Sequence, residues 1–167
     1  LTEAMPFEIR FVSIGSRRGA ISAMDGVADI AVVSQSEGSG PVWDETALET
    51  LGGYRRDLVI MSRDPELLDL ERIEDLRVLG WSRESEMNRI FRKILTESGR
   101  PSVAFAGQAR SHAAVAAQVL AGRADLGFGV REATGGSNLA TRKVAEDEIL
   151  FLVHPEKIDS DAVQAFL

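Results

Sequence analysis

The chain has no cysteine among its 167 residues, which excludes a disulfide framework, a thiolate metal site and a cysteine nucleophile. Aromatic residues make up only 6% of the chain. The two histidines, His112 and His154, do not stand at the spacing that metal ligands use, so we expect no metal, and nothing points to another cofactor. No apolar run is long enough to span a membrane, and no basic-then-apolar signal segment opens the sequence. We therefore expect no membrane contact.

Clustered basic residues are scarce too. The formal net charge is −7, and the densest basic cluster is the pair Arg17 and Arg18. A nucleic-acid surface needs clustered positive charge to displace counterions, so we expect no nucleic-acid binding by this segment. That expectation does not extend to a DNA-binding domain fused upstream. Apolar content of 44% and charged content of 27% are ordinary for a globular protein.

The chain does contain a repeated phrase. Residues 21–33 read ISAMDGVADIAVV, and residues 116–130 read AAQVLAGRADLGFGV. Each phrase is an apolar helical stretch, a glycine, one variable residue, and then Ala-Asp with an apolar strand. Repeats of a supersecondary unit indicate repeated architecture, and this spacing suits two similar lobes. Asp29 and Asp125 open the two strands, and we expect each to bond locally to its turn rather than to act in catalysis.

Strand and helix patterns alternate along the chain, which predicts an α/β fold of βαβ units with parallel strands. Strands are expected at residues 7–12, 29–33, 57–61, 77–81, 102–106, 125–130 and 148–153. Helices are expected at residues 17–24, 45–51, 70–76, 83–97, 112–120 and 160–167. We assign residues 1–55 with 150–167 to lobe 1 and residues 56–149 to lobe 2. The opening residues resemble the last turn of a helix, so the first strand and helix of lobe 1 are expected to be missing upstream.

Three strand-to-helix turns carry short hydroxyl side chains, at residues 13–16, 82–85 and 108–111. In an open α/β sheet such turns face the crevice at the carboxyl ends of the strands, where a helix start offers unpaired N–H groups to a ligand. Serine is also a favoured N-cap, so any single turn fits plain capping. Three such turns in both lobes make a shared ligand pocket an equal alternative.

Three further candidate residues stand at a helix start or directly after a predicted strand. His112 begins a helix, where it either donates a hydrogen bond to a ligand or is solvated. Ser34 directly follows a predicted strand. Arg131 holds the equivalent place in the second repeat, where it pairs with a ligand acid or with the neighbours of Glu132 on the surface. The candidate ligand-binding residues are Ser13, Gly15, Ser16, Ser34, Ser82, Ser85, Ser111, His112 and Arg131. No catalytic set is evident, so we expect no enzyme activity.

These segments together resemble a known superfamily. They are the turn at Gly15 and Ser16 with the helix leading to Ala28 and Asp29, the segment 70–99, SHAAVAA at 111–117 with GRADLGFGV at 122–130, and residues 146–153 followed by 161–167. Their order and spacing resemble the type II periplasmic-binding-protein superfamily. Within it, the chain looks most similar to the binding-protein-like domain of molybdopterin-biosynthesis and molybdate-linked proteins and of helix-turn-helix regulators.

The resemblance implies an α/β fold with two Rossmann-like lobes, a hinge and an inter-lobe cleft that closes on a small ligand. Molybdate-linked relatives would bind an oxyanion, but this chain departs from their Gly-Ser-Gly-Thr-like turn. Glu84 and Glu86 stand there instead and weigh against an anion, whether an oxyanion or a small carboxylate, so an amino- or hydroxyl-bearing metabolite becomes equally plausible.

The function implied is the sensing half of a cytoplasmic transcriptional regulator, with a homodimer as one arrangement. Two alternatives stay open. One is an extracytoplasmic solute-binding receptor of a transporter, and the other is a substrate-binding domain linked to molybdopterin biosynthesis. An enzyme of the prephenate-dehydratase or porphobilinogen-deaminase kind ranks below these, because the chain has neither a Thr-Arg-Phe phrase nor a cofactor cysteine.

Overall fold

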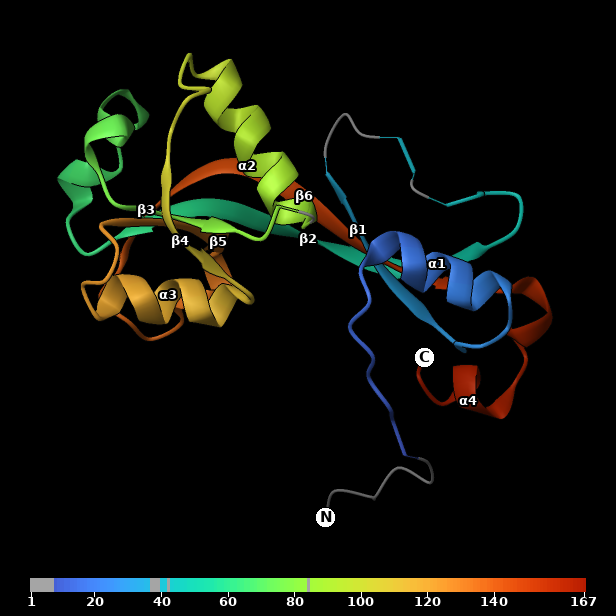
Figure 1. The fold of residues 1–167 in the computed structure, drawn as a ribbon. Coiled ribbons are helices and arrows are strands. Elements are labelled where there is room, and N and C mark those ends of the chain that lie inside the picture. Colours follow the sequence, from blue (N-terminus) through green and yellow to red (C-terminus); the bar gives the residue numbers. More distant parts are fainter. Residues whose placement is uncertain (1–7, 37–39, 42, 84) are drawn as a thin grey trace. The chain divides into compact units, whose positions relative to one another are not determined.

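The computed structural model describes residues 8–36, 40–41, 43–83 and 85–167. It is a mixed α/β structure with one six-stranded sheet in the order β1-β6-β2-β5-β3-β4 (Figure 1). The chain forms two compact units: unit 1 is Leu1–Tyr54 with Glu148–Leu167, and unit 2 is Arg55–Asp147. Strands β2 (Glu49–Ser62) and β6 (Ala140–Val153) contribute residues to both units. The predicted α/β class is confirmed, whereas two lobes with a hinge and a cleft are not shown and stay a prediction.

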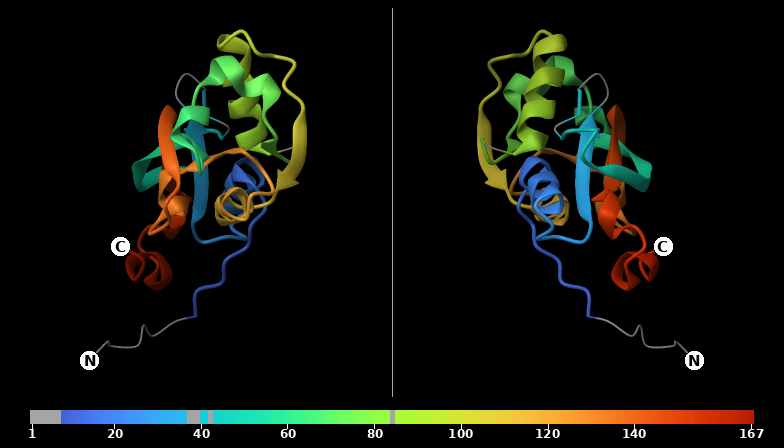
Figure 2. Two further views of the ribbon diagram at one scale, coloured as in Figure 1. Left: turned by 90° about the vertical axis from the view of Figure 1, so that its left-hand side faces the viewer. Right: turned by 90° about the vertical axis from the view of Figure 1, so that its right-hand side faces the viewer.

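Unit 1 is built around a helix and an edge strand. Helix α1 (Ser16–Met24) packs against β1 (Ala31–Ser36), as the blue helix and neighbouring strand in Figure 2 show. The short helix α4 (Asp161–Gln164) follows β6, and the hydroxyl of Ser160 caps it by accepting from the backbone N–H of Val163. The small core of this unit consists of buried aliphatic side chains: Ala20, Ala23, Ala31, Val33, Leu48 and Leu152.

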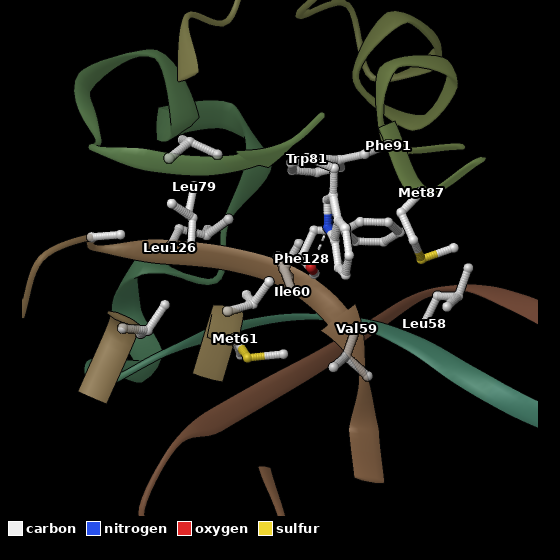
Figure 3. Close-up of a cluster of buried hydrophobic side chains, with 14 of the residues drawn as sticks. Leu58, Val59, Ile60, Met61, Leu79, Trp81, Met87, Phe91, Leu126 and Phe128 are labelled. Atoms are coloured by element: carbon white, nitrogen blue, oxygen red, sulfur yellow. Dashed lines mark hydrogen bonds between the residues drawn. The ribbon is translucent and has the colours of Figure 1, made fainter. Parts of the chain in front are cut away.

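Unit 2 holds the larger core. Strands β3 (Val78–Trp81), β4 (Phe105–Ala109) and β5 (Leu126–Val130) lie between α2 (Glu86–Glu97) and α3 (His112–Leu120), which Figure 1 shows on opposite faces. The ring of Phe91 on α2 stacks between those of Phe128 on β5 and Phe105 on β4, with centroids 4.5 Å and 5.8 Å apart. Figure 3 shows Phe128 and Phe91 beside Trp81 in this core. Short 3₁₀ helices at Pro65–Leu67, Leu70–Asp75 and Arg131–Thr134 complete the unit.

The repeated phrase corresponds to a repeated structure. Each copy ends its helix in a Schellman motif whose glycine, Gly26 or Gly122, has a φ of 69°. The partner expected for each aspartate is wrong, however. Asp125 accepts hydrogen bonds from the backbone N–H and the guanidinium of Arg77 at 2.6–3.0 Å. Asp29 accepts from Lys157 at 2.8 Å. In both copies a basic residue distant in the sequence holds the start of the strand.

Two predicted elements are absent from the described chain. The part of the predicted strand 7–12 that is described, residues 8–12, forms no strand, and Phe11 is 83% exposed. An alternating pattern forms a strand only where a neighbour offers hydrogen bonds. The predicted helix at 45–51 is also wrong, since the segment turns at Asp44 and enters β2. Gly53 belongs to that strand because β6 approaches closely: a Cβ there would lie 2.3 Å from the carbonyl oxygen of Ile149.

Candidate ligand-binding site

In unit 2, three neighbouring strands end at one edge of the sheet. Strand β3 pairs in parallel with both β4 and β5, so the carboxyl ends of all three point the same way. Ser82, Ser111 and Arg131 follow these strand ends, and the topology therefore places three of the candidate residues along one edge. In open α/β sheets this is the edge where ligands bind.

His112 lies at this edge with its ring held on two sides. Its Nδ1 accepts a hydrogen bond from the backbone N–H of Val130, with 3.3 Å between the nitrogens. The ring also contacts the indole of Trp81 edge-on, with centroids 4.8 Å apart. Trp81 is fixed in turn, because its Nε1 donates to the carbonyl oxygen of Phe128 at 2.9 Å (Figure 3). His112 is thus a preorganised, partly buried side chain.

A charged pair lies close to this histidine. Arg56 on β2 donates from Nε and from a terminal nitrogen to one oxygen of Asp147, at 2.9 Å and 2.6 Å. The side chain of Asp147 is fully buried and that of Arg56 is 16% exposed. Burial, together with a smaller effect of the positive charge of Arg56, lowers the pKa of His112 from 6.5 to about 4. His112 is therefore neutral at pH 7.

Two candidate serines of unit 2, Ser85 and Ser111, serve as helix caps. The hydroxyl of Ser85 accepts from the N–H of Asn88 and donates to the carbonyl of Ser82. The hydroxyl of Ser111 accepts from the N–H of Ala114 at 3.1 Å. Capping does not consume the proton of the Ser111 hydroxyl, so its assignment as a ligand donor stays a prediction.

Arg131 is engaged with an acid on the strand beside it. Its Nε donates to Asp57 at 3.0 Å and its Nη1 to the hydroxyl of Thr141 at 2.9 Å. Hydrogen bonds from Lys143 and Arg131 hold the pKa of Asp57 below its usual value. A ligand acid at Arg131 would have to compete with Asp57, which lies 74 positions away and was not indicated by the sequence.

In unit 1 the structure brings two candidates together. The hydroxyl of Ser16, the first residue of α1, accepts a hydrogen bond from the backbone N–H of Ser34 on β1 at 3.0 Å. Gly15 precedes the helix with a φ of 83°, a conformation that favours glycine. Ser13 is exposed just before it. An open groove of about 490 Å³ lies along the same helix, lined by Arg17, Ala20, Ile21, Met24, Pro41, Trp43 and Asp44.

Two negative findings apply to the described residues only. No three His, Asp or Glu side chains in that part of the chain are grouped so that they could hold a metal ion. In the same residues, no helix has the length and apolar character needed to cross a membrane.

The charged pair close to His112 was not found from the sequence. Arg56 and Asp147 are 91 positions apart, and neither stands in a motif. Gly129 is a second omission: a Cβ on it would lie 3.3 Å from His112 Nδ1 and 3.2 Å from Met61 Cε. The Gly-Phe-Gly phrase of β5 was the available signal, because alternate glycines in a strand indicate a close approach by another element.

Three solved structures illustrate what this fold is similar to. The effector binding domain of QuiR in complex with shikimate aligns with a TM-score of 0.67 at 15% identity, covering 91% of this chain and 74% of that one. A Corynebacterium glutamicum OxyR C206 mutant aligns at 0.61 and 17% identity, covering 92% and 49%. The Synechocystis PCC6803 CcmR regulatory domain in complex with 2-PG aligns at 0.65 and 13% identity, covering 91% and 76%.

At these identities the likeness shows the fold alone. The chain spans about three quarters of the two domain structures and about half of the OxyR chain. No curated protein sequence matches it. A family model, however, matches almost the whole chain, and it agrees with the resemblance seen in the sequence. With residues 2–167 matched, the chain belongs to the family described as the PBP superfamily domain, PBP_like.

Proposed function

We propose that this chain is a small-ligand-binding effector domain and forms the sensing part of a transcriptional regulator acting in the cytoplasm. The observation that carries the proposal is the alignment of over 90% of the chain with effector-binding and regulatory domains. The QuiR domain is in complex with shikimate, and the CcmR domain is in complex with 2-PG. A ligand of that size, with a carboxylate or another oxyanion, fits the hydrogen-bond donors at the helix starts.

The proposed mechanism is a population shift. Each compact unit offers polar groups at a helix start: Ser16 with Ser34 in unit 1, and Ser111 with His112 in unit 2. A ligand that bonds to both sets only when the two units close on it binds the closed state more tightly than the open state. This difference in affinity sets how far the ligand shifts the population toward the closed state. Closure would then re-orient a fused DNA-binding domain or a partner copy. The two lobes, the hinge and the cleft are part of this proposal.

A thermal-shift screen tests the proposal. The panel contains shikimate, 2-PG, benzoate, sulfate and molybdate, so that the oxyanion alternative is tested in the same experiment. A true ligand at one hundred times its Kd should stabilise the fold by about 2.7 kcal/mol. For a chain of this length that raises Tm by roughly 5–10 °C.

Variants then locate the site. Ser16→Ala and His112→Ala should each reduce the shift given by a hit. Ser160→Ala, which removes a cap far along the chain in α4, should lower Tm without changing the shift. No hit from the panel, or a hit whose shift is the same in both site variants, would contradict the proposal.

A further inference from the structure

The hydrogen bond at His112 determines where its ring proton lies. A backbone N–H can only donate, so the Nδ1 that accepts from Val130 at 3.3 Å must present a lone pair. A neutral imidazole carries one ring proton, which is therefore on Nε2. Trp81 covers the ring from one side and is itself 6% exposed. The side chain thus has one orientation and one tautomer.

Strand β5 lies beside the ring, and the glycine at position 129 leaves space for the ring in this orientation. Gly129 immediately precedes Val130 on β5, and a Cβ there would lie 3.3 Å from Nδ1. That separation is tighter than an ordinary van der Waals contact, so a side chain at position 129 pushes the ring away from the N–H that fixes it. Gly129 is accordingly a positioning residue for His112.

The second ring nitrogen, Nε2, is suited to a ligand group that accepts a hydrogen bond. His112 is only partly buried, and no side chain or carbonyl in the described residues accepts a hydrogen bond from Nε2. The positive charge of the Arg56 guanidinium helps to lower the pKa of His112, so it also disfavours a second positive charge beside the ring. Asp147 is bonded to that guanidinium, so its carboxylate does not offer a counter-charge to a cationic ligand.

Building on the proposed function, we propose that His112 is a specificity-determining hydrogen-bond donor. Its Nε2–H selects ligands that place an acceptor oxygen at the carboxyl edge of β5, and small carboxylates above all. Ligands that place an ammonium there are rejected. This choice separates the small carboxylate from the amino-bearing metabolite that the sequence left open.

Nitrogen NMR of the ligand-free chain tests the tautomer directly. With only two histidines in the sequence, the ring signals are assigned by comparison with His154→Gln. At pH 7 we expect Nδ1 of His112 to appear as a bare ring nitrogen and Nε2 as a protonated one. A protonated Nδ1, or an imidazolium at that pH, would overturn the inference whatever the chain binds.

Titration with two probes tests the selection. Benzoate and benzylamine are of similar size and opposite charge. Benzoate should shift the Nε2 resonance of His112 in a saturable manner, and benzylamine should not. An equal or larger response to benzylamine, or no response to benzoate or shikimate, overturns the selection. These outcomes are separable from the proposed function, which the thermal-shift panel decides through any of its ligands.

Matched substitutions test the position of the donor. His112→Gln keeps an amide N–H near the place of Nε2, whereas the shorter amide of His112→Asn reaches only the place of Nδ1. A hydrogen bond to a charged group implies a loss of roughly tenfold or more in benzoate affinity for Asn, and Gln should retain part of it. Gly129→Ala should lose affinity like Asn. Gly107→Ala on β4, whose Cβ meets Leu79 at the same 3.3 Å, should not. Equal affinities in all four variants would overturn the inference.

Discussion

At the scale of single residues, His112 links stability to pH. Its pKa is near 6.5 when the chain is unfolded and about 4 in the folded state. Between those values the unfolded chain binds more protons, so acidification from pH 6.5 to pH 4 lowers the free energy of unfolding. The slope contributed is at most about 1.4 kcal/mol per pH unit. Urea denaturation at pH 7 and pH 5 should show a larger loss for the parent chain than for His112→Gln. Equal losses would contradict the burial of a neutral ring.

The charged pair beside it should be costly to break. Asp147 is fully buried and its partner Arg56 is 16% exposed, so Asp147→Ala leaves a cation largely removed from water. Removing one member of a buried pair typically costs about 3–5 kcal/mol. The double variant Arg56→Met with Asp147→Leu should recover much of that loss, because no charge remains to be solvated. Urea denaturation measures both. If the double variant were less stable than Asp147→Ala, the unpaired charge of Arg56 would not be the cause of the lost stability.

At the scale of elements, the packing of α3 on β5 depends on Gly127. A Cβ at this position would lie 2.4 Å from Val115 Cγ1 and 3.0 Å from Val119 Cγ2. Gly127→Ala should therefore destabilise the chain by about 1–3 kcal/mol, since the helix has to move outward. Gly52→Ala is the control, because a Cβ there meets nothing within 4 Å. The two midpoints in urea provide the comparison, and equal midpoints would mean that α3 does not pack as closely as described.

Elements were predictable where their signals are local. Helix α3 begins at His112 and ends at Leu120 as predicted, because Ser111 and Gly122 mark both of its ends within the sequence. Helix α2 begins at Glu86 rather than at residue 83, since Ser85 and not Ser82 is the cap. The strand expected at 102–106 lies at Phe105–Ala109, where its register with β3 decides the pairing. Register depends on a partner strand, and one segment alone does not contain that information.

At the scale of the whole molecule, the repeat predicted the right fold class but not how the strands combine. Nothing in the sequence of residues 49–54 indicates that the strand predicted at 57–61 extends back through two glycines. That extension requires the backbone of β6 next to Gly53. The candidate site was partly predictable for a similar reason. The serines and His112 were predictable because they stand at helix starts, which have a local sequence signal. Arg56 and Asp147 come together only through the pairing of distant segments, so their contact was not predictable.

The proposed closure is measurable because the chain has no cysteine, so introduced cysteines are labelled selectively. Val27→Cys in unit 1, where the residue is 82% exposed, and Ser98→Cys at the end of α2 in unit 2 accept a donor and acceptor dye. A ligand that acts by closing the two units should change the transfer efficiency with the same midpoint as its thermal shift, because both report one equilibrium. The pair Ser98→Cys and Leu120→Cys lies within unit 2 and should not respond. Stabilisation by ligand without any change in the first pair would mean that binding occurs without closure, and regulation would then have to act through rigidification of one unit.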